Sequence, residues 1–147
     1  MIDRISLLAV LNDEIPITRA LGIKVDQLTD HSILLSAPLE NNINHKSTAF
    51  GGSLYSVAVL AGWGMIYSLL DSLNLHAHIV IHESHIEYLK PVNQAIQASC
   101  EIDSQAEFDK KIKLYKRKGI SRINLVVDIN NAGQLAVKFN GQYVIHN

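Results

Sequence analysis

The chain has 147 residues and a mass of 16.3 kDa, so we expect residues 1–147 to form one domain that needs no disulfide or metal. Charged residues make up 18% and hydrophobic residues 48%, a balance that excludes a disordered or low-complexity chain. The formal net charge of -1 creates no global field for nucleic acid or an anionic membrane, so neither is expected as a partner.

The first residues and the cysteine content bear on the compartment. Residues 1–11 carry Asp3 and Arg4 and lack the apolar centre of a secretory signal. Cys100 is the only cysteine, so it cannot form an internal disulfide, and no Cys/His spacing resembles a zinc site. We therefore expect a cytoplasmic protein in a reducing compartment.

The first third of the chain shows three local patterns. Apolar residues recur at helical spacing near the N-terminus and predict a short helix over residues 3–11. Two apolar runs on either side of a polar turn at 29–31 indicate a hairpin over residues 23–37. Residues 38–48 lack periodicity and are rich in asparagine, so we expect a surface loop that leads into a helix near Gly51.

The longest apolar stretch, Ser47 to Leu70, carries no charged side chain and is long enough to cross a hydrocarbon layer of about 30 Å as a helix. Its glycines and serines, and the lack of a lysine or arginine asymmetry at its ends, argue against a membrane span. We predict a helix from about Gly52 to Leu73, roughly 33 Å long. Because it is apolar on every side, we expect a sheet to wrap around it.

Alternating patterns predict four further strands, over residues 79–89, 96–103, 122–129 and 135–139. Between the second and third, Phe108, Ile112 and Tyr115 fit either a short amphipathic helix or a distorted hairpin arm. Cys100 falls among core residues and is expected to be inert. The order predicts an α+β fold in which an antiparallel sheet wraps around one long helix. A second copy could pair with an exposed edge strand, so we expect a homodimer.

The stretch from Asn44 to Leu54 joins the polar loop to the first turn of the apolar helix. Unpaired N–H groups at a helix N-terminus stabilise negative charge, and Gly51 and Gly52 lack the Cβ that would keep a substrate carbonyl away. Such donors form an oxyanion hole, in which each is worth about 10² to 10³ in rate. The alternative is that the two glycines only permit a tight turn into the helix.

Three segments carry a resemblance to a known family: Thr48–Leu54, Ala61–Trp63 and Ile86–Val92. They resemble hotdog-fold thioesterases, most closely a group of proposed thioesterases that is sometimes fused behind an N-acetyltransferase domain. The resemblance covers nearly the whole chain after the N-terminal helix. It implies a hotdog fold, an acyl thioester of coenzyme A or of acyl carrier protein as substrate, a homodimer or homotetramer, and no cofactor or metal. Acetyltransferase activity is not implied.

The sequence departs from the catalytic pattern of the related phenylacetyl-CoA type of hotdog thioesterase. Asn44 matches the asparagine that precedes the two glycines in that type, but Phe50 stands where it has a histidine. The acidic residue that the phenylacetyl-CoA type carries on its helix would fall near Val59 in this sequence. No carboxylate occurs here between Gly51 and Leu70. The resemblance therefore supports an acyl thioester site and leaves the mechanism open.

Four residues are candidates for the general base: His45, His82, Glu83 and His85. Each histidine also suits a structural or surface role. Alternation along the strand places four residues on the face expected to meet the helix: His82, Ser84, Ile86 and Tyr88. Glu83 falls on the other face and could instead lie across a dimer interface, near the partner's loop.

Six of the chain's thirteen basic residues lie between Lys110 and Lys118. We expect this stretch to contact the phosphates of coenzyme A or the acidic surface of an acyl carrier protein. The alternative is a solvated face. Nucleic-acid binding fits less well, because Tyr115 is the only aromatic residue in the stretch. Trp63 and Tyr67 are expected in the core or at an interface.

The sequence thus predicts an acyl thioesterase that acts on acyl-CoA or acyl carrier protein substrates by water attack at an oxyanion hole. The residues assigned to catalysis are Asn44, Gly51, Gly52, His45 and Glu83. Those assigned to substrate binding are Thr48, Phe50, Ser53, Ser84, Tyr88, Lys116 and Arg117. The alternative is a hotdog-fold protein that binds or senses acyl thioesters without turnover. A hotdog dehydratase is disfavoured, because no motif pairs a histidine with a carboxylate.

Overall fold

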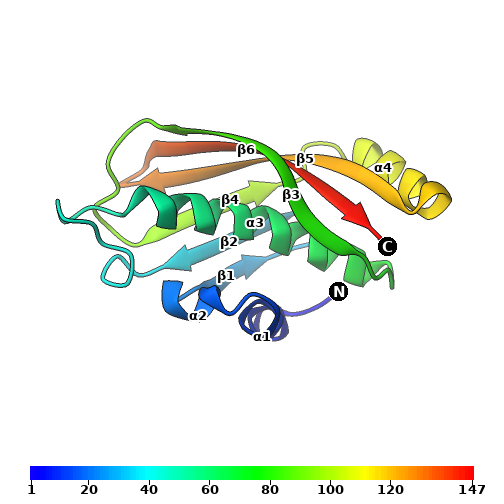
Figure 1. Ribbon diagram of the computed structural model, residues 1–147, viewed down its shortest axis with the longest axis horizontal. Helices are drawn as coiled ribbons and strands as arrows, with labels where there is room; N and C mark the ends of the chain where they lie inside the picture. Colours follow the sequence, from blue (N-terminus) through cyan, green and yellow to red (C-terminus); the bar gives the residue numbers. More distant parts are fainter.

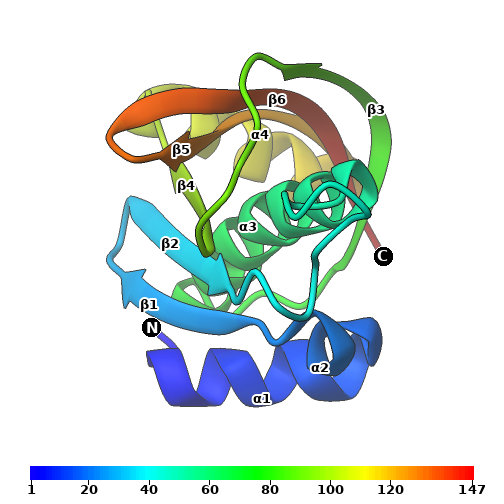
Figure 2. The same ribbon diagram turned by 90° about the vertical axis from the view of Figure 1, so that its left-hand side faces the viewer.

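The computed structural model describes residues 1–147. Its elements are α1 (Arg4–Glu14), α2 (Ile17–Leu21), β1 (Lys24–Leu28), β2 (Ser32–Ala37), α3 (Gly51–Ser72), β3 (His78–Tyr88), β4 (Ile96–Glu101), α4 (Gln105–Lys118), β5 (Ile120–Asn131) and β6 (Gln134–His146). The strands form one antiparallel sheet in the order β1-β2-β4-β5-β6-β3. The sheet curls around α3 (Figures 1 and 2), which confirms the predicted α+β fold.

The long helix α3 is the centre of the core, and most of its length is buried by the sheet. It is the one helix long and apolar enough to cross a membrane. A helix buried in a protein core has the same length and composition, and most of α3 is buried. Tyr143 of β6 packs against Gly62, where a Cβ would lie 2.2 Å from the tyrosine Oη. The Tyr143 hydroxyl donates to the carbonyl of Val59 at 2.7 Å, so glycine at position 62 is what lets helix and sheet approach this closely.

At one edge of the sheet, the N-terminal helices cover β1 (Figure 2). The Asp3 side chain caps α1 by accepting from the Ser6 N–H at 2.7 Å, and the helix runs three residues beyond the predicted end. Arg4 Nη1 donates to the Asp26 carbonyl of β1 at 2.7 Å. Because this guanidinium occupies an outward carbonyl, the β1 edge is protected from pairing with another strand.

The region between β4 and β5 resolves the predicted choice between a helix and a hairpin arm in favour of the helix. In α4 the residues at helical spacing, Phe108, Ile112 and Tyr115, are buried, and Gly119 ends the helix with a φ of 74°. The Tyr115 hydroxyl donates to the carbonyl of His76 at 2.7 Å, which fixes α4 beside the C-terminal end of α3. Cys100 is buried as predicted, and burial raises the pKa of its thiol to about 12, so it stays protonated.

The other edge strand, β3, contains a β-bulge that corrects the predicted alternation. Pairing with β6 jumps from Ile81 opposite Tyr143 to Glu83 opposite Gln142, so His82 has no residue opposite it. One extra residue reverses which side chains point inward. Strict alternation had placed His82 beside Ser84 on the helix side, whereas the structure makes it the bulge residue.

Candidate functional site

The loop that leads into α3 is held in place mainly by backbone hydrogen bonds. The N–H of Ala49 donates to the Val92 carbonyl at 2.7 Å, and the N–H of Phe50 donates to the Asn42 carbonyl at 2.7 Å. The buried Asn42 side chain donates in turn to the Leu21 carbonyl at 2.9 Å. These contacts fix where α3 begins relative to α2 and to the segment after β3.

Asn44 organises this loop with its own side chain. Its Nδ2 donates to the Thr48 hydroxyl at 2.9 Å, while its Oδ1 accepts from the N–H groups of Lys46 at 2.8 Å and of Thr48 at 3.1 Å. Both ends of the amide are therefore engaged within the loop. In this arrangement Asn44 positions the loop rather than reaching a substrate.

The first turn of α3 has no cap. Phe50 stands at the N-cap position with φ -63° and ψ 134°, and it makes no side-chain bond to the helix. The first intrahelical bond runs from the Leu54 N–H to the Phe50 carbonyl at 3.0 Å. The N–H groups of Gly51, Gly52 and Ser53 have no acceptor in the protein. Three unpaired donors thus lie at the positive end of a 22-residue helix dipole, which favours negative charge at this position.

Aromatic rings flank these amides. The Tyr88 hydroxyl donates to the Gly51 carbonyl at 3.0 Å, and its ring lies 3.6 Å from where a Cβ on Gly51 would be. The Phe50 ring lies over Gly52, although 58% of Phe50 is exposed. Burial raises the pKa of Tyr88, so its hydroxyl remains a donor at neutral pH. A carbonyl reaching the amides would thus pass between two rings.

Tyr55 is the site residue that sequence reasoning misses. Its hydroxyl and that of Ser84 are hydrogen-bonded to each other, which ties the second turn of α3 to β3. Tyr55 stands four residues after Gly51, and this spacing, which places two residues on one helix face, could have revealed it.

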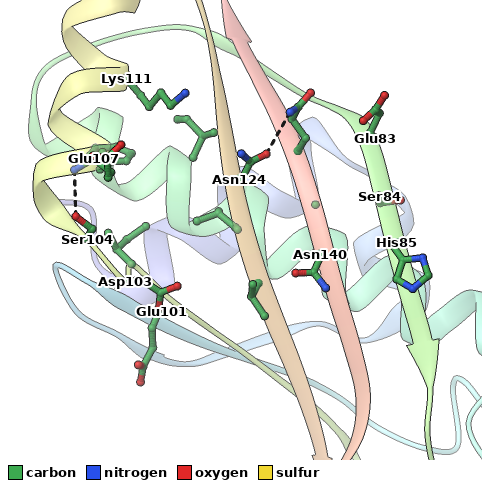
Figure 3. A pocket seen from close by; sticks show the side chains of 17 residues that line it. Glu83, Ser84, His85, Glu101, Asp103, Ser104, Glu107, Lys111, Asn124 and Asn140 are labelled. Atoms are coloured by element: carbon green, nitrogen blue, oxygen red, sulfur yellow. Dashed lines mark hydrogen bonds between the residues drawn. The ribbon is translucent and has the colours of Figure 1, made fainter.

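The structure brings together one group of the predicted residues and separates the rest. Around the free amides lie Thr48, Phe50, Ser53, Ser84 and Tyr88, and His45 is exposed in the adjoining loop. Glu83 and His85 project from the outer face of the sheet, with the strands between them and α3 (Figure 3). Lys116 and Arg117 lie on α4, at the other end of α3.

A groove on the surface of the single chain lies away from the amides. It has a volume of about 930 Å³ and crosses the outer faces of β5, β6 and β3 beside α4 (Figure 3). Its labelled residues include Glu83 and His85 of β3, Asn124 of β5, and Glu107 and Lys111 of α4. None of Gly51, Gly52 and Ser53 lines it.

One side of α3 carries large side chains that the sheet leaves half-buried: Tyr55, Val59, Trp63 and Tyr67. The rings of Trp63 and Tyr67 stack with centroids 5.2 Å apart, and Trp63 Nε1 donates to the Ile79 carbonyl of β3 at 3.1 Å. This half-buried face therefore adjoins the β3 edge. The prediction that both aromatics lie in the core or at an interface fits this position.

An antiparallel sheet wrapped around one long helix, with unpaired amides at the start of that helix, defines a hotdog-fold protein of the thioesterase type. The YiiD_C model, described as a putative thioesterase, matches residues 5–147, and the chain belongs to this family. The predicted family resemblance is thereby confirmed.

Solved structures agree with this assignment. A protein of unknown function from Chlorobaculum tepidum is 36% identical, with a TM-score of 0.94 over 98% of this chain and 94% of that one. A putative thioesterase from Shewanella oneidensis is 30% identical, with a TM-score of 0.84 over 98% of this chain and 97% of that one. A thioesterase from Haemophilus influenzae, 17% identical with a TM-score of 0.72 over 99% and 92% of the two chains, shares the fold.

Proposed function

We propose that this protein hydrolyses acyl thioesters, with the carbonyl oxygen of the substrate bound by the N–H groups of Gly51 and Gly52. The observation that carries the proposal is the uncapped start of α3, where three amides point at no acceptor. Donors of this kind stabilise the oxyanion formed when a thioester carbonyl is attacked, and fixed amides need no reorganisation as the charge develops.

In the proposed reaction, water adds to the carbonyl carbon and the oxyanion accepts from the two glycine amides. The carbon–sulfur bond then breaks, and the thiol leaves with a proton that came from the water. The side chains against Gly51 and Gly52 are phenyl and phenol rings, which cannot act as a base at neutral pH. We assign the base role to His45, because its loop leads directly into α3 and an imidazole is the side chain best suited to proton transfer near neutral pH.

A second copy of the chain would complete this site. The β3 edge has no strand beside it, and Val80 on that strand is 46% exposed. The half-buried face of α3 lies next to this edge, so one partner could cover both. We propose a homodimer formed by antiparallel pairing of two β3 strands, with the acyl chain held between the two α3 helices.

The test removes one amide without disturbing the helix. Gly51 is the first helical residue, where proline is tolerated, and the extended backbone of Phe50 is the conformation favoured before proline. We expect Gly51→Pro to lower kcat/KM for acyl-CoA substrates by about 10² to 10³, because a proline has no N–H.

Gly51→Ala is the matched control, since its Cβ would meet the Tyr88 ring at an ordinary 3.6 Å and the N–H is kept. Both variants add a Cβ at position 51, so any loss caused by that Cβ is shared, and Gly51→Ala should be about 10² to 10³ more active than Gly51→Pro. A panel of acyl-CoA chain lengths, assayed by thiol release, supplies the rates, and urea unfolding checks both variants. Equal activity of the two variants would show that the amide is not the oxyanion donor.

The second candidate function is acyl-thioester binding without turnover. It is favoured by the absence of any carboxylate on α3 between Gly51 and Leu70, and by the engagement of Asn44 within its own loop. Tight binding of acyl-CoA by the wild-type chain, weakened by Gly51→Pro and accompanied by no thiol release, would establish the binding role instead.

A further inference from the structure

The exposed side of α4 carries a group of cations with almost no intramolecular partners. This basic face consists of Lys110, Lys113, Lys116, Arg117 and Lys118. Lys110 pairs with Glu107 at 2.9 Å, and no other member forms a salt bridge. Two or three cations in the last turn would be enough to complement the helix dipole, so the face carries more charge than the helix itself needs.

The shape of the basic face selects a protein rather than a small phosphate. The face is the outer side of a surface helix, and none of its five members lines the groove beside α4. Small phosphorylated ligands bind in concave sites, whereas a convex charged helix complements an extended surface of opposite sign.

Within one chain, the basic face is remote from the free amides. The Tyr115 contact with the His76 carbonyl places α4 at the C-terminal end of α3, and the amides lie at the opposite end (Figure 1). A 22-residue helix separates the two ends by about 33 Å. A partner docked on α4 would therefore deliver its substrate poorly to the site of the same chain.

Antiparallel pairing of two β3 strands changes this relation. In each chain the Tyr88 end of β3 contacts the start of α3, and the His78 end follows the segment that contacts α4. When two such strands run antiparallel, the Tyr88 end of one lies at the level of the His78 end of the other. The basic face of each chain then shares one end of the dimer with the free amides of its partner.

We propose that the basic face of α4 docks the acidic surface of an acyl carrier protein, whose thioester arm enters the site of the partner chain. The proposal rests on the proposed function and names its carrier. It assigns α4 a role in choosing the substrate carrier while the chemistry takes place at the other copy's α3.

The first test compares one acyl group on two carriers. Lys113→Glu/Lys118→Glu reverses two cations of the basic face. Arg19→Glu/Lys24→Glu makes the same change of charge on exposed residues of α2 and β1. We expect the α4 variant to lower kcat/KM for the acyl carrier protein substrate by about tenfold or more, and to leave the acyl-CoA rate within twofold.

The control variant should keep both rates within about twofold. The wild-type rate with the carrier protein should also fall steeply with salt, as electrostatic docking requires. An equal loss with both carriers, or an equal loss in both variants, would overturn the docking proposal. If the basic face instead served an anionic membrane, binding to phosphatidylserine vesicles and no preference for the carrier protein would overturn it as well.

The second test asks which site is served. A heterodimer isolated through two tags combines one Gly51→Pro chain with one Lys113→Glu/Lys118→Glu chain. Docking in trans pairs the intact α4 of the first chain with the intact site of the second, so we expect about half of the wild-type rate with the carrier protein. Docking in cis leaves no chain with both parts intact, and the rate would stay near the mean of the two impaired homodimers.

The failure of this inference is distinguishable from failure of the proposed function. If the wild-type chain releases no thiol from either carrier, the proposed hydrolysis fails, and docking is read from the affinity for the holo carrier protein. An affinity that Lys113→Glu/Lys118→Glu weakens tenfold supports docking, and an unchanged affinity rejects it. A chain that stays monomeric at assay concentration rejects delivery in trans.

Discussion

The two ends of α3 are finished in opposite ways. At the C-terminal end, the Leu75 N–H donates to the Leu70 carbonyl at 2.9 Å and the Ser72 hydroxyl donates to the Leu69 carbonyl at 2.7 Å. Asn74 adopts a φ of 54°, a left-handed conformation that lets the chain turn back over the helix end. At the N-terminal end, no side chain caps the helix and three amides stay free.

The contrast indicates that the open end serves a purpose other than stability. A serine, threonine, aspartate or asparagine at the N-cap stabilises a helix by about 0.5 to 2 kcal/mol, and α1 and α4 both have one. The longest helix has Phe50 there instead. A capping side chain would place an oxygen atom where the proposed substrate oxygen binds. The proposed activity therefore requires a helix start without a cap.

The largest expected effect comes from closing the open end. Phe50→Asp supplies a carboxylate that accepts from the N–H of Gly52 or Ser53, and we expect unfolding to become harder by about 1 kcal/mol. Because the same amides would no longer be free, kcat/KM should fall by about 10² to 10³. Urea unfolding and thiol release measure the two effects.

Phe50→Ala is the control for the loss of the ring, because it removes the ring without adding an acceptor. It should gain no stability and should lose less activity than Phe50→Asp. If the aspartate variant becomes more stable and keeps its rate, the free amides are not the site.

The fold was largely predictable because it rests on patterns of short range. The uncharged stretch that became α3, the turn at 29–31 and the alternation in β4 each follow from periodicity. Alternation failed at His82, because a bulge is set by pairing with β6 rather than by the strand's own sequence. The spacing of Phe108, Ile112 and Tyr115 suited two structures, and only packing of α4 along β5 selects the helix.

The candidate site was predictable in its backbone and less so in its side chains. The two glycines before an apolar run indicated the start of a helix with free amides, and the structure places it there. Asn44 matched a family position by spacing, but an asparagine beside polar loop residues also bonds to nearby backbone N–H groups, as it does here.

The closed end of α3 allows a second, smaller prediction. The Tyr115 hydroxyl, which joins α4 to the carbonyl of His76, is lost in Tyr115→Phe. We expect unfolding to become easier by about 0.5 to 1.5 kcal/mol, because the carbonyl of His76 loses its donor. Tyr67→Phe removes a hydroxyl that makes no hydrogen bond in the protein and should leave the urea midpoint unchanged. Equal losses of stability in both variants would show that this hydrogen bond does not anchor α4.

The smallest expected effect concerns the charge at the closed end. Asp71 lies in the last turn of α3, is exposed and forms no salt bridge, so its carboxylate faces the negative end of the helix dipole. Asp71→Asn should stabilise the protein by about 0.3 to 1 kcal/mol at low ionic strength. The gain should vanish in about 1 M salt, where charges are screened within about 3 Å. Glu40→Gln, an equivalent change in an exposed loop, should show no gain at either salt concentration. A gain for Asp71→Asn that persists in high salt would mean that the carboxylate is opposed by a local contact and not by the helix as a whole.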